Sequence, residues 1–439
     1  LSFAPGWNAV APSLASAAAP RRAMLRLVAA AAAGFAGGSP PRRLPSGPLI
    51  VGYTGCDQQK VIAEAAKGVN VIIWFASNLV RNATTGQPQV ATGLNHTCVA
   101  EVAQELRRRR LPTAHMLCVG GWDAPHPNTS FSGQHWFEAW DAWNRREAAR
   151  PALGFPGYDG IDWDLEGNDA PASAWNHFRL GSGLGYPNPN PNPNPHPSPK
   201  PSPSPFSAAT IALVGSMSQA LKRAGYLVSL VPPQSYADAT DGGFDRSLLH
   251  SYADWRPAFR YRGRNAYMAW LSSRYAVTHR GDGPVDGGGA LRGGGVRTFD
   301  FVSVQLYESW SRASQAIDGP PQVPAAQYLA ALARAYARGW RVDFGADAAV
   351  DIPSQTVAIP PDQLVLGFSF GSGPPDLGKS LFVRPEAVAA AWGALAPAER
   401  PRGMMFWNLG LDGVALVNGS NRTCGLAAGF NAFMHVRDG

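Results

Sequence analysis

The chain has 439 residues, of which 45% are hydrophobic and 16% are charged, and its formal net charge is +7. So few charges exclude a disordered polyelectrolyte, and the length is enough for one large core or two ordinary ones. Much of the positive charge lies in short arginine clusters, such as Arg107 to Arg110. Nucleic-acid binding requires a basic stripe interleaved with aromatic residues, and none is visible, so we expect no nucleic-acid partner.

The first 47 residues predict a leader. From about Met24, a short charged start precedes an alanine-rich apolar run through Phe35 and then small residues, a pattern typical of a secretory signal peptide. The apolar run is too short to span a membrane, and no later segment is typical of a span, so we expect no membrane association. We expect a secreted protein. An endomembrane or organelle location is the alternative, because no acidic residue precedes Asp57. The chain opens on Leu1, so its true start stays open.

Sequons and cysteines favour secretion as well. Five N-x-[ST] sequons lie in loop-like stretches, at Asn82, Asn95, Asn128, Asn418 and Asn421. Four cysteines, Cys56, Cys98, Cys118 and Cys424, permit two disulfides, and their pairing stays open. Cys118 lies in an apolar strand pattern, so a buried thiol is the alternative there. No C-x-x-C pair exists, and we expect neither a metal nor a cofactor.

Short β-branched and aromatic runs alternate with helical patterns, which predicts a parallel sheet covered by helices. The candidate strands are 49–54, 69–77, 113–121, 158–166, 226–232, 299–307, 364–370 and 403–409. Helical patterns lie at 58–67, 98–110, 133–149, 207–224, 325–338 and 385–395. Eight strands with helices between them favour an α/β fold, a (β/α)8 TIM barrel with surface insertions, over an open doubly wound sheet.

Two stretches interrupt this pattern. Residues 187–205 form a Pro/Asn/Ser tract, which is typical of an extended, disordered spacer. Four strands precede the tract and four follow it, and neither half closes a barrel alone, so we interpret it as an insertion. A second insertion spans about 238–297, with a short helical piece at 244–255, an aromatic segment around 267–270 and a glycine-rich tail. A single barrel is therefore expected over residues 48–435.

One predicted strand ends in a run of carboxylates, from Asp159 to Glu166 in the sequence DGIDWDLE. Side chains alternate along a strand, so Asp162, Asp164 and Glu166 share one face. Such neighbours repel one another as charges, so a proton must be shared and at least one pKa raised, which suits an acid–base site. The alternatives are a solvated acidic loop or a calcium loop, but a calcium loop would place Gly and Asn between its ligands, not Ile, Trp and Leu.

This run resembles the D-G-x-D-x-D-x-E signature of glycoside hydrolase family 18 at every specified position. Further segments are similar to motifs of that family, in the same order: 50–53 to its first strand, 117–121 to S-x-G-G, 303–308 to Q-x-Y-N or M-x-Y-D, and 403–407 to G-x-M-x-W. The pattern is closest to the plant class III, hevamine-like branch. Two positions depart from it, because Cys118 stands where the family has Ser and Glu308 where it has Asn or Asp.

The resemblance implies hydrolysis of β-1,4 N-acetylglucosamine linkages in chitin or chitooligosaccharides, with retention and with the substrate's acetamido oxygen as nucleophile. It implies that Glu166 is the acid and base, that Asp164 orients the acetamido group, and that Asp162 shares a proton with Asp164. Tyr307 would donate its hydroxyl to the acetamido oxygen. The expected substrate-binding residues are Trp407, which would stack under the sugar, Gln305, Tyr53, Gly120, Gly121 and Glu308. Asp159 is expected to fix the start of the strand.

Two other functions stay open. An endo-β-N-acetylglucosaminidase acting on N-glycans would use the same catalytic residues, and the loops would decide between the substrates. A chitin-binding lectin on an inactive barrel typically lacks the last Glu or the preceding Asp of the signature, and this chain keeps both Glu166 and Asp164. In either case the protein is expected to be a monomer.

Overall fold

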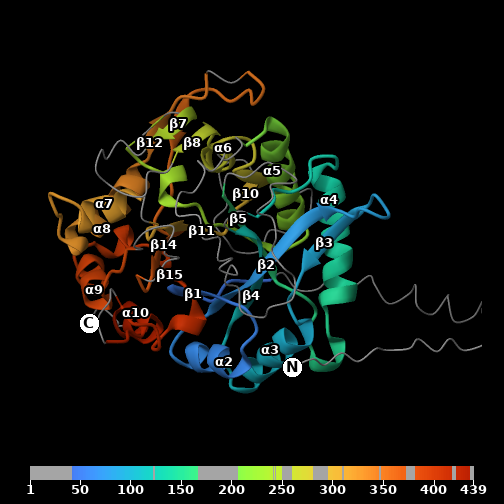
Figure 1. The fold of residues 1–439 in the computed structure, drawn as a ribbon, viewed down its shortest axis with the longest axis horizontal. Coiled ribbons are helices and arrows are strands. Elements are labelled where there is room, and N and C mark those ends of the chain that lie inside the picture. The colour runs from blue at the N-terminus through green and yellow to red at the C-terminus, as the bar shows by residue number, and fades with distance from the viewer. Residues whose placement is uncertain are drawn as a thin grey trace, which may run out of the picture. The chain divides into compact units, whose positions relative to one another are not determined.

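Eight parallel strands close into a barrel at the centre of the computed structural model (Figure 1). They are β1 (Leu49–Thr54), β2 (Val71–Arg81), β4 (Ala114–Gly121), β5 (Gly160–Leu165), β6 (Leu227–Leu230), β11 (Phe301–Gln305), β14 (Leu364–Ser369) and β15 (Gly403–Trp407). Neighbours in chain order pair with each other, and β1 pairs with both β2 and β15, which closes the ring. The predicted (β/α)8 barrel is confirmed, and each predicted strand overlaps one of these eight.

The structure describes residues 42–435 except for 122–123, 167–205, 241, 243, 250–259, 280–294, 309–310, 346–347, 372–380 and 418–421. Most of the predicted leader, the Pro-rich tract and the glycine-rich tail lie outside the described residues. All statements below concern the unit that begins at Arg42.

Helices follow most of the barrel strands and pack on the outside of the barrel (Figure 1). The six predicted helices are present as α2 (Gln58–Ala66), α3 (His96–Arg108), α4 (Gly133–Trp143), α5 (Ala208–Arg223), α8 (Ala325–Arg338) and α9 (Pro385–Gly393). The helix predicted over 133–149 changes at Asn144–Ala148 to a π-helical turn. Three helices were not predicted: α6 (Ala266–Ser272), α7 (Arg312–Asp318) and α10 (Leu426–Met434). Single 3-10 turns cover 151–153, 234–236, 397–399 and 409–411.

Short antiparallel pairs lie outside the ring. They are β3 (Pro88–Thr92) on the end of β2, β7 (Asp245–Leu249) with β8 (Arg260–Arg264), β9 (Val277–His279) with β10 (Gly295–Arg297), and β12 (Trp340–Val342) with β13 (Gln355–Val357).

The predicted helical piece at 244–255 is wrong, because residues 245–249 form a strand. Their backbone hydrogen bonds go to residues 260–264, and such non-local pairing overrides a local helical pattern.

Strand alternation produces two apolar layers. Inside the ring, side chains such as those of Val51, Ile73 and Met405 form one cluster, and the half-buried rings of Tyr307 and Trp407 pack against it. The opposite faces of the strands pack against the helices in a second, larger cluster. Burial of these apolar side chains is the main source of the stability of the fold.

A single disulfide, Cys56–Cys98, joins the loop after β1 to the start of α3. Cys118 is a buried free thiol, which was the alternative for that residue, and Cys424 is a half-buried free thiol.

Within the residues that the structure describes, no helix is long and apolar enough to cross a membrane. Over the same residues, no group of His, Cys, Asp and Glu side chains could hold a metal ion.

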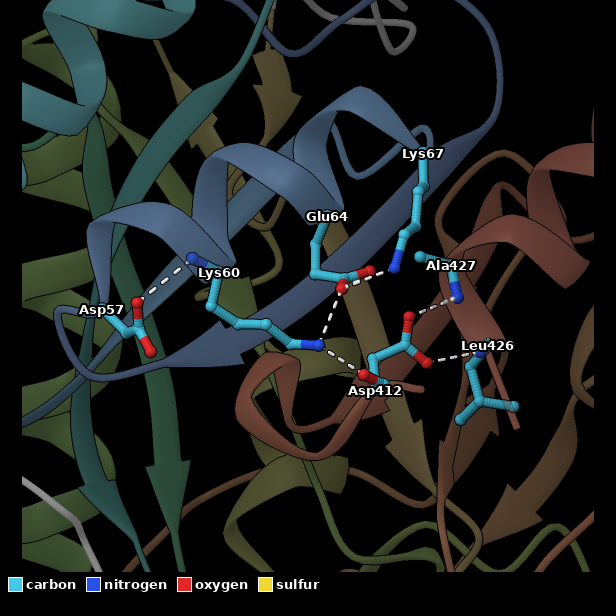
Figure 2. A network of polar contacts seen from close by, with 7 residues as sticks. All are labelled: Asp57, Lys60, Glu64, Lys67, Asp412, Leu426 and Ala427. Atoms are coloured by element: carbon cyan, nitrogen blue, oxygen red, sulfur yellow. Dashed lines mark hydrogen bonds and ion pairs between the residues drawn. The ribbon is translucent and has the colours of Figure 1, made fainter. Parts of the chain in front are cut away.

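The loop after β15 is tied to α2 and α10 by buried polar contacts (Figure 2). Asp412 accepts the backbone N–H groups of Leu426 at 2.5 Å and Ala427 at 3.3 Å, so it caps the start of α10. The buried carboxylate of Glu64 lies 2.9 Å from the ammonium group of Lys60 and 2.8 Å from that of Lys67. Lys60 also donates to the carbonyl oxygen of Asp412. The network therefore links α2, which follows the first barrel strand, to the loop after the last barrel strand.

Candidate active site

The start of β5 is fixed by the first two residues of the acidic run. Asp159 accepts the backbone N–H of His115 at 2.8 Å and lies 3.5 Å from the guanidinium group of Arg42. A Cβ atom on Gly160 would lie 1.9 Å from the carbonyl oxygen of Leu227, so only glycine allows β5 to approach β6 here. Both residues therefore position the strand, as predicted for Asp159.

Alternation along β5 places its carboxylates inside the barrel and its apolar side chains outside. The indole N–H of Trp163 donates to Ser218 on α5 at 2.9 Å, while Ile161 and Leu165 join the outer cluster. Asp162 and Asp164, on the opposite face, are buried. Glu166 follows the last residue of the strand and is half-buried, so it lies at the carboxyl end of the barrel, where barrel active sites form.

Asp162 is held by two hydroxyl donors. Tyr53 on β1 donates to its Oδ2 at 2.5 Å, and Ser229 on β6 donates to its Oδ1 at 2.5 Å. Burial raises the pKa of Asp162 to about 6, and the two hydrogen bonds oppose that rise because they favour the charged form. Burial also raises the pKa of Tyr53 well above its ordinary value, so its hydroxyl stays a donor.

The carboxyl groups of Asp164 and Glu166 are neighbours at the end of β5, where both contact the amide of Gln305. Burial, followed by the charges of Glu166 and Asp162 and a hydrogen bond with Glu166, raises the pKa of Asp164 well above its ordinary value. The raised pKa of Asp164 favours a protonated carboxyl group next to the half-buried Glu166, which is the condition that an acid–base site needs.

Gln305, at the end of β11, brings its amide group to both carboxyl groups. Its Nε2 lies 3.1 Å from Asp164 Oδ1, 3.4 Å from Glu166 Oε1 and 2.8 Å from the carbonyl oxygen of Val231. The structure thus unites Gln305 with Asp164 and Glu166, although 139 positions separate Gln305 from Glu166 in the chain.

The residues of β4 lie directly beside β5. The thiol of Cys118 lies 4.0 Å from Asp164 Oδ2, and burial raises its pKa well above the ordinary value, so it stays uncharged. Gly120 has a φ of 109°, and a Cβ atom there would lie 2.1 Å from the carbonyl oxygen of Asp164. Gly120 therefore acts through close packing, whereas a Cβ atom on Gly121 would meet nothing within 4 Å.

Aromatic rings adjoin the carboxyl groups through Tyr53, which donates to Asp162. The indole of Trp407, at the end of β15, lies 4.6 Å from the ring of Phe75 and 5.6 Å from that of Tyr53, measured between ring centroids. Tyr307 follows β11 and is half-buried. Burial and the charge of Glu308 raise the pKa of Tyr307 well above its ordinary value, so its hydroxyl is available as a donor.

Glu308 is buried, and its two carboxyl oxygens have no hydrogen-bond partner among the described residues. Burial and the charge of Glu166 raise its pKa well above the ordinary value, which favours the neutral form of Glu308. Two further contacts, one to Asp162 and one to the end of β5, come from residues that were not predicted. They are Ser229, which faces Asp162 in the β5–β6 register, and Tyr267, which contacts the end of β5. Ser229 has an inward position in the predicted strand 226–232, and that position could have identified it as a contact of Asp162.

Comparisons with known proteins give only distant likenesses. No family model matches the chain, and no curated protein matches it. The chain is similar to a chitinase from Aspergillus fumigatus, with 13% identity over 86% of this chain and 94% of the other and a TM-score of 0.43. It is similar to a glycoside hydrolase family 18 chitinase from Pseudoalteromonas aurantia (12% identity, 82% and 94% covered, TM-score 0.40).

A xylanase and α-amylase inhibitor protein from Scadoxus multiflorus is similar to the same extent, with 13% identity over 82% of this chain and 93% of the other and a TM-score of 0.40. The solved structures found thus include the family that the sequence motifs resemble.

Proposed function

We propose that this protein is a glycoside hydrolase of the family 18 type, which cleaves β-1,4-linked N-acetylglucosamine in chitin or chitooligosaccharides. The observation that carries the proposal is the pair of carboxyl groups of Asp164 and Glu166, which share the amide of Gln305 at the carboxyl end of β5. Among the described residues, no group of side chains could hold a metal ion there. The proposed reaction needs only the protons of the protein and the acetamido group of the substrate.

In the proposed reaction, Glu166 protonates the glycosidic oxygen while the acetamido oxygen of the substrate attacks the anomeric carbon. Asp164 accepts the acetamido N–H and orients the group, and Tyr307 donates its hydroxyl to the acetamido oxygen. Asp162 shares a proton with Asp164 and so tunes its charge, and its own pKa, raised by burial to about 6, supports that role. Water then opens the oxazolinium intermediate, with Glu166 as the base, so the β-anomer is retained.

The sugar undergoing cleavage would stack on Trp407, whose ring packs against Phe75 and is half-buried. Gln305, Tyr53, Gly121 and Glu308 would line the same subsite. The N-glycan alternative uses the same groups, and the loops that would decide between the substrates include residues 167–205, outside the described part of the chain.

We also propose that the protein is secreted and acts as a monomer. The disulfide between Cys56 and Cys98 supports an oxidising compartment. The sequons at Asn82 and Asn128 lie in loops, and Asn95 caps α3 at an exposed position, while those at Asn418 and Asn421 lie outside the described residues.

The test compares Glu166→Gln with Asp159→Asn. Both exchange a carboxylate for an amide within the same run, but Asp159 only fixes the start of the strand. We expect Glu166→Gln to lower kcat on chitooligosaccharides by about 10³-fold or more, because an acid–base group supplies about 10²–10⁴-fold. Asp159→Asn should keep most of the activity, because an amide oxygen can still accept the His115 N–H.

Product analysis identifies the reaction itself. Defined chitooligosaccharides and a high-mannose glycoprotein are incubated in parallel with the unaltered protein, and chain length and anomer are read together by chromatography and NMR. Early accumulation of the β-anomer from chitooligosaccharides supports the proposal. If glycans are released from the glycoprotein and chitooligosaccharides are not cleaved, the substrate is an N-glycan and not chitin. Binding of either substrate without any turnover would point to a lectin.

A further inference from the structure

The hydroxyl group of Tyr267 contacts both backbone polar groups of the last residue of β5. The N–H of Leu165 donates to this hydroxyl at 2.8 Å, and the hydroxyl donates to the carbonyl oxygen of Leu165 at 3.0 Å. Both residues are buried. The phenol therefore makes the two hydrogen bonds that a residue of a neighbouring strand would make to Leu165, the residue immediately before Glu166.

The neighbouring strand cannot make these two hydrogen bonds itself. The N–H of Val231 donates to the carbonyl oxygen of Trp163 at 3.0 Å, and Pro232 and Pro233, which follow, have no N–H. The carbonyl oxygen of Val231 accepts the amide of Gln305 at 2.8 Å. The hydrogen bonds between β5 and β6 thus end one step before Leu165. Without Tyr267, the buried N–H and C=O of Leu165 would be left without partners.

Tyr267 is held firmly by its surroundings. It lies in α6, whose N-cap Asn265 donates its backbone N–H to the carbonyl oxygen of Phe244 at 3.0 Å. Its ring packs against Trp270 at 5.1 Å and Tyr236 at 6.0 Å between centroids. The indole of Trp270 donates to the carbonyl oxygen of Ile211 at 2.9 Å, which ties α6 to α5. The ring has little freedom to move away from Leu165.

From these contacts we infer that Tyr267 is a positioning residue for Glu166, supplied by the insertion between β6 and β11. This inference rests on the proposed function. Tyr267 fixes the backbone at Leu165, so Glu166 leaves the strand in a fixed direction, with its Oε1 3.4 Å from the amide of Gln305. Without the hydroxyl, the unpaired backbone groups would turn toward water and carry Glu166 with them.

Burial supports this role for the phenol. It raises the pKa of Tyr267 well above its ordinary value, so the hydroxyl stays neutral and can both donate and accept. A phenylalanine would keep the ring contacts and lose only the hydrogen bonds of the hydroxyl, which are the two to Leu165 and a longer one of 3.4 Å to the carbonyl oxygen of Trp163. Misplacing a catalytic group by about 1 Å costs about 10²-fold in rate, which sets the size of the expected effect.

The test is Tyr267→Phe in the full chain, with Tyr336→Phe as the matched control. Tyr336 on α8 is also buried, and its hydroxyl has no hydrogen-bond partner in the described part of the chain. We expect kcat on chitooligosaccharides to fall about 10–100-fold in Tyr267→Phe, with KM changed less than about threefold. Tyr336→Phe should leave both constants unchanged. All kinetics are recorded well below the thermal midpoint of each variant, where both are folded.

Hydrogen exchange at the Leu165 amide is the second readout and does not depend on activity. We expect faster exchange at Leu165 in Tyr267→Phe than in the unaltered chain, with no change in Tyr336→Phe. An unchanged kcat in Tyr267→Phe would overturn the inference, even if its thermal midpoint falls. If the unaltered chain hydrolyses neither substrate, the proposed function fails. The positioning role is then judged by exchange alone, and unchanged exchange at Leu165 overturns it.

Discussion

The phenol of Tyr53 and the carboxyl group of Asp162 join β1 to β5 through a hydrogen bond of 2.5 Å, across 109 positions of the chain. The other carboxyl oxygen of Asp162 accepts the hydroxyl of Ser229 at 2.5 Å. These two donors favour the charged form of a buried acid and so set how far burial can raise its pKa.

Tyr53→Phe should therefore shift the pH dependence of activity. Losing one donor raises the pKa of Asp162 further above about 6, and the proposed reaction needs Asp162 ionised so that it can share the proton of Asp164. The acid limb of the kcat/KM profile should move to higher pH by about one to two units, since a hydrogen bond to a charged group contributes about 1.5–3 kcal/mol. Ser229→Ala should move it in the same direction. An acid limb unchanged in both variants would contradict this role of Asp162.

Trp407→Ala should weaken substrate binding. The half-buried indole is backed by Phe75 and Tyr53, so one side is already supported by protein and the other can receive a sugar ring. Removing it loses about 1.5–3 kcal/mol of apolar burial, so KM for chitooligosaccharides should rise about 10–100-fold. Trp407→Phe should lose less because a ring remains. Equal KM values for the alanine variant and the unaltered chain would exclude the stacking role.

The strand pattern was sufficient to predict the barrel and the placement of Asp162 and Asp164, because a period of two assigns faces without knowledge of strand neighbours. It could not predict Tyr267, because the contact of Tyr267 with Leu165 depends on how an insertion folds back 102 positions away. The helix predicted at 244–255 failed for a related reason. The pairing of 245–249 with 260–264 is a non-local choice that a local pattern does not record.

The disulfide should make a measurable contribution to stability. Cys56 and Cys98 close a loop with a sequence separation of 42, for which loop-closure entropy gives about 4 kcal/mol. The double variant Cys56→Ser, Cys98→Ser should unfold at lower denaturant concentration, by about 2–4 kcal/mol in free energy, and Cys424→Ser should change little. Alkylation of the denatured, unreduced protein should label Cys118 and Cys424 alone. Labelling of all four cysteines would show that the bridge is absent.

The network of Figure 2 predicts how stability depends on pH. Burial and the neighbouring Glu64 raise the pKa of Asp412 to about 7, so between about pH 4 and 7 the folded state holds a proton that the unfolded state has released. This contribution to stability is present in full below about pH 4 and is lost progressively as the pH rises from about 4 to 7, by up to about 4 kcal/mol. The pKa of Glu64 is lowered: burial acts to raise it, but hydrogen bonds from Asp412, Lys67 and Lys60 prevail, so Glu64 stays charged over this window.

Asp412→Asn should remove most of that dependence. An asparagine cannot lose a proton, but its amide can still accept the Leu426 N–H and donate toward Glu64. The free energy of unfolding of the variant should therefore rise relative to that of the unaltered chain, by about 2–4 kcal/mol between pH 4.5 and 8. Asp57→Asn is the matched control, because Asp57 is the exposed N-cap of α2 and asparagine caps equally well. Denaturant unfolding at a series of pH values measures the difference. Parallel pH curves for Asp412→Asn and the unaltered chain would show that Asp412 gives up no proton as the pH rises through this window.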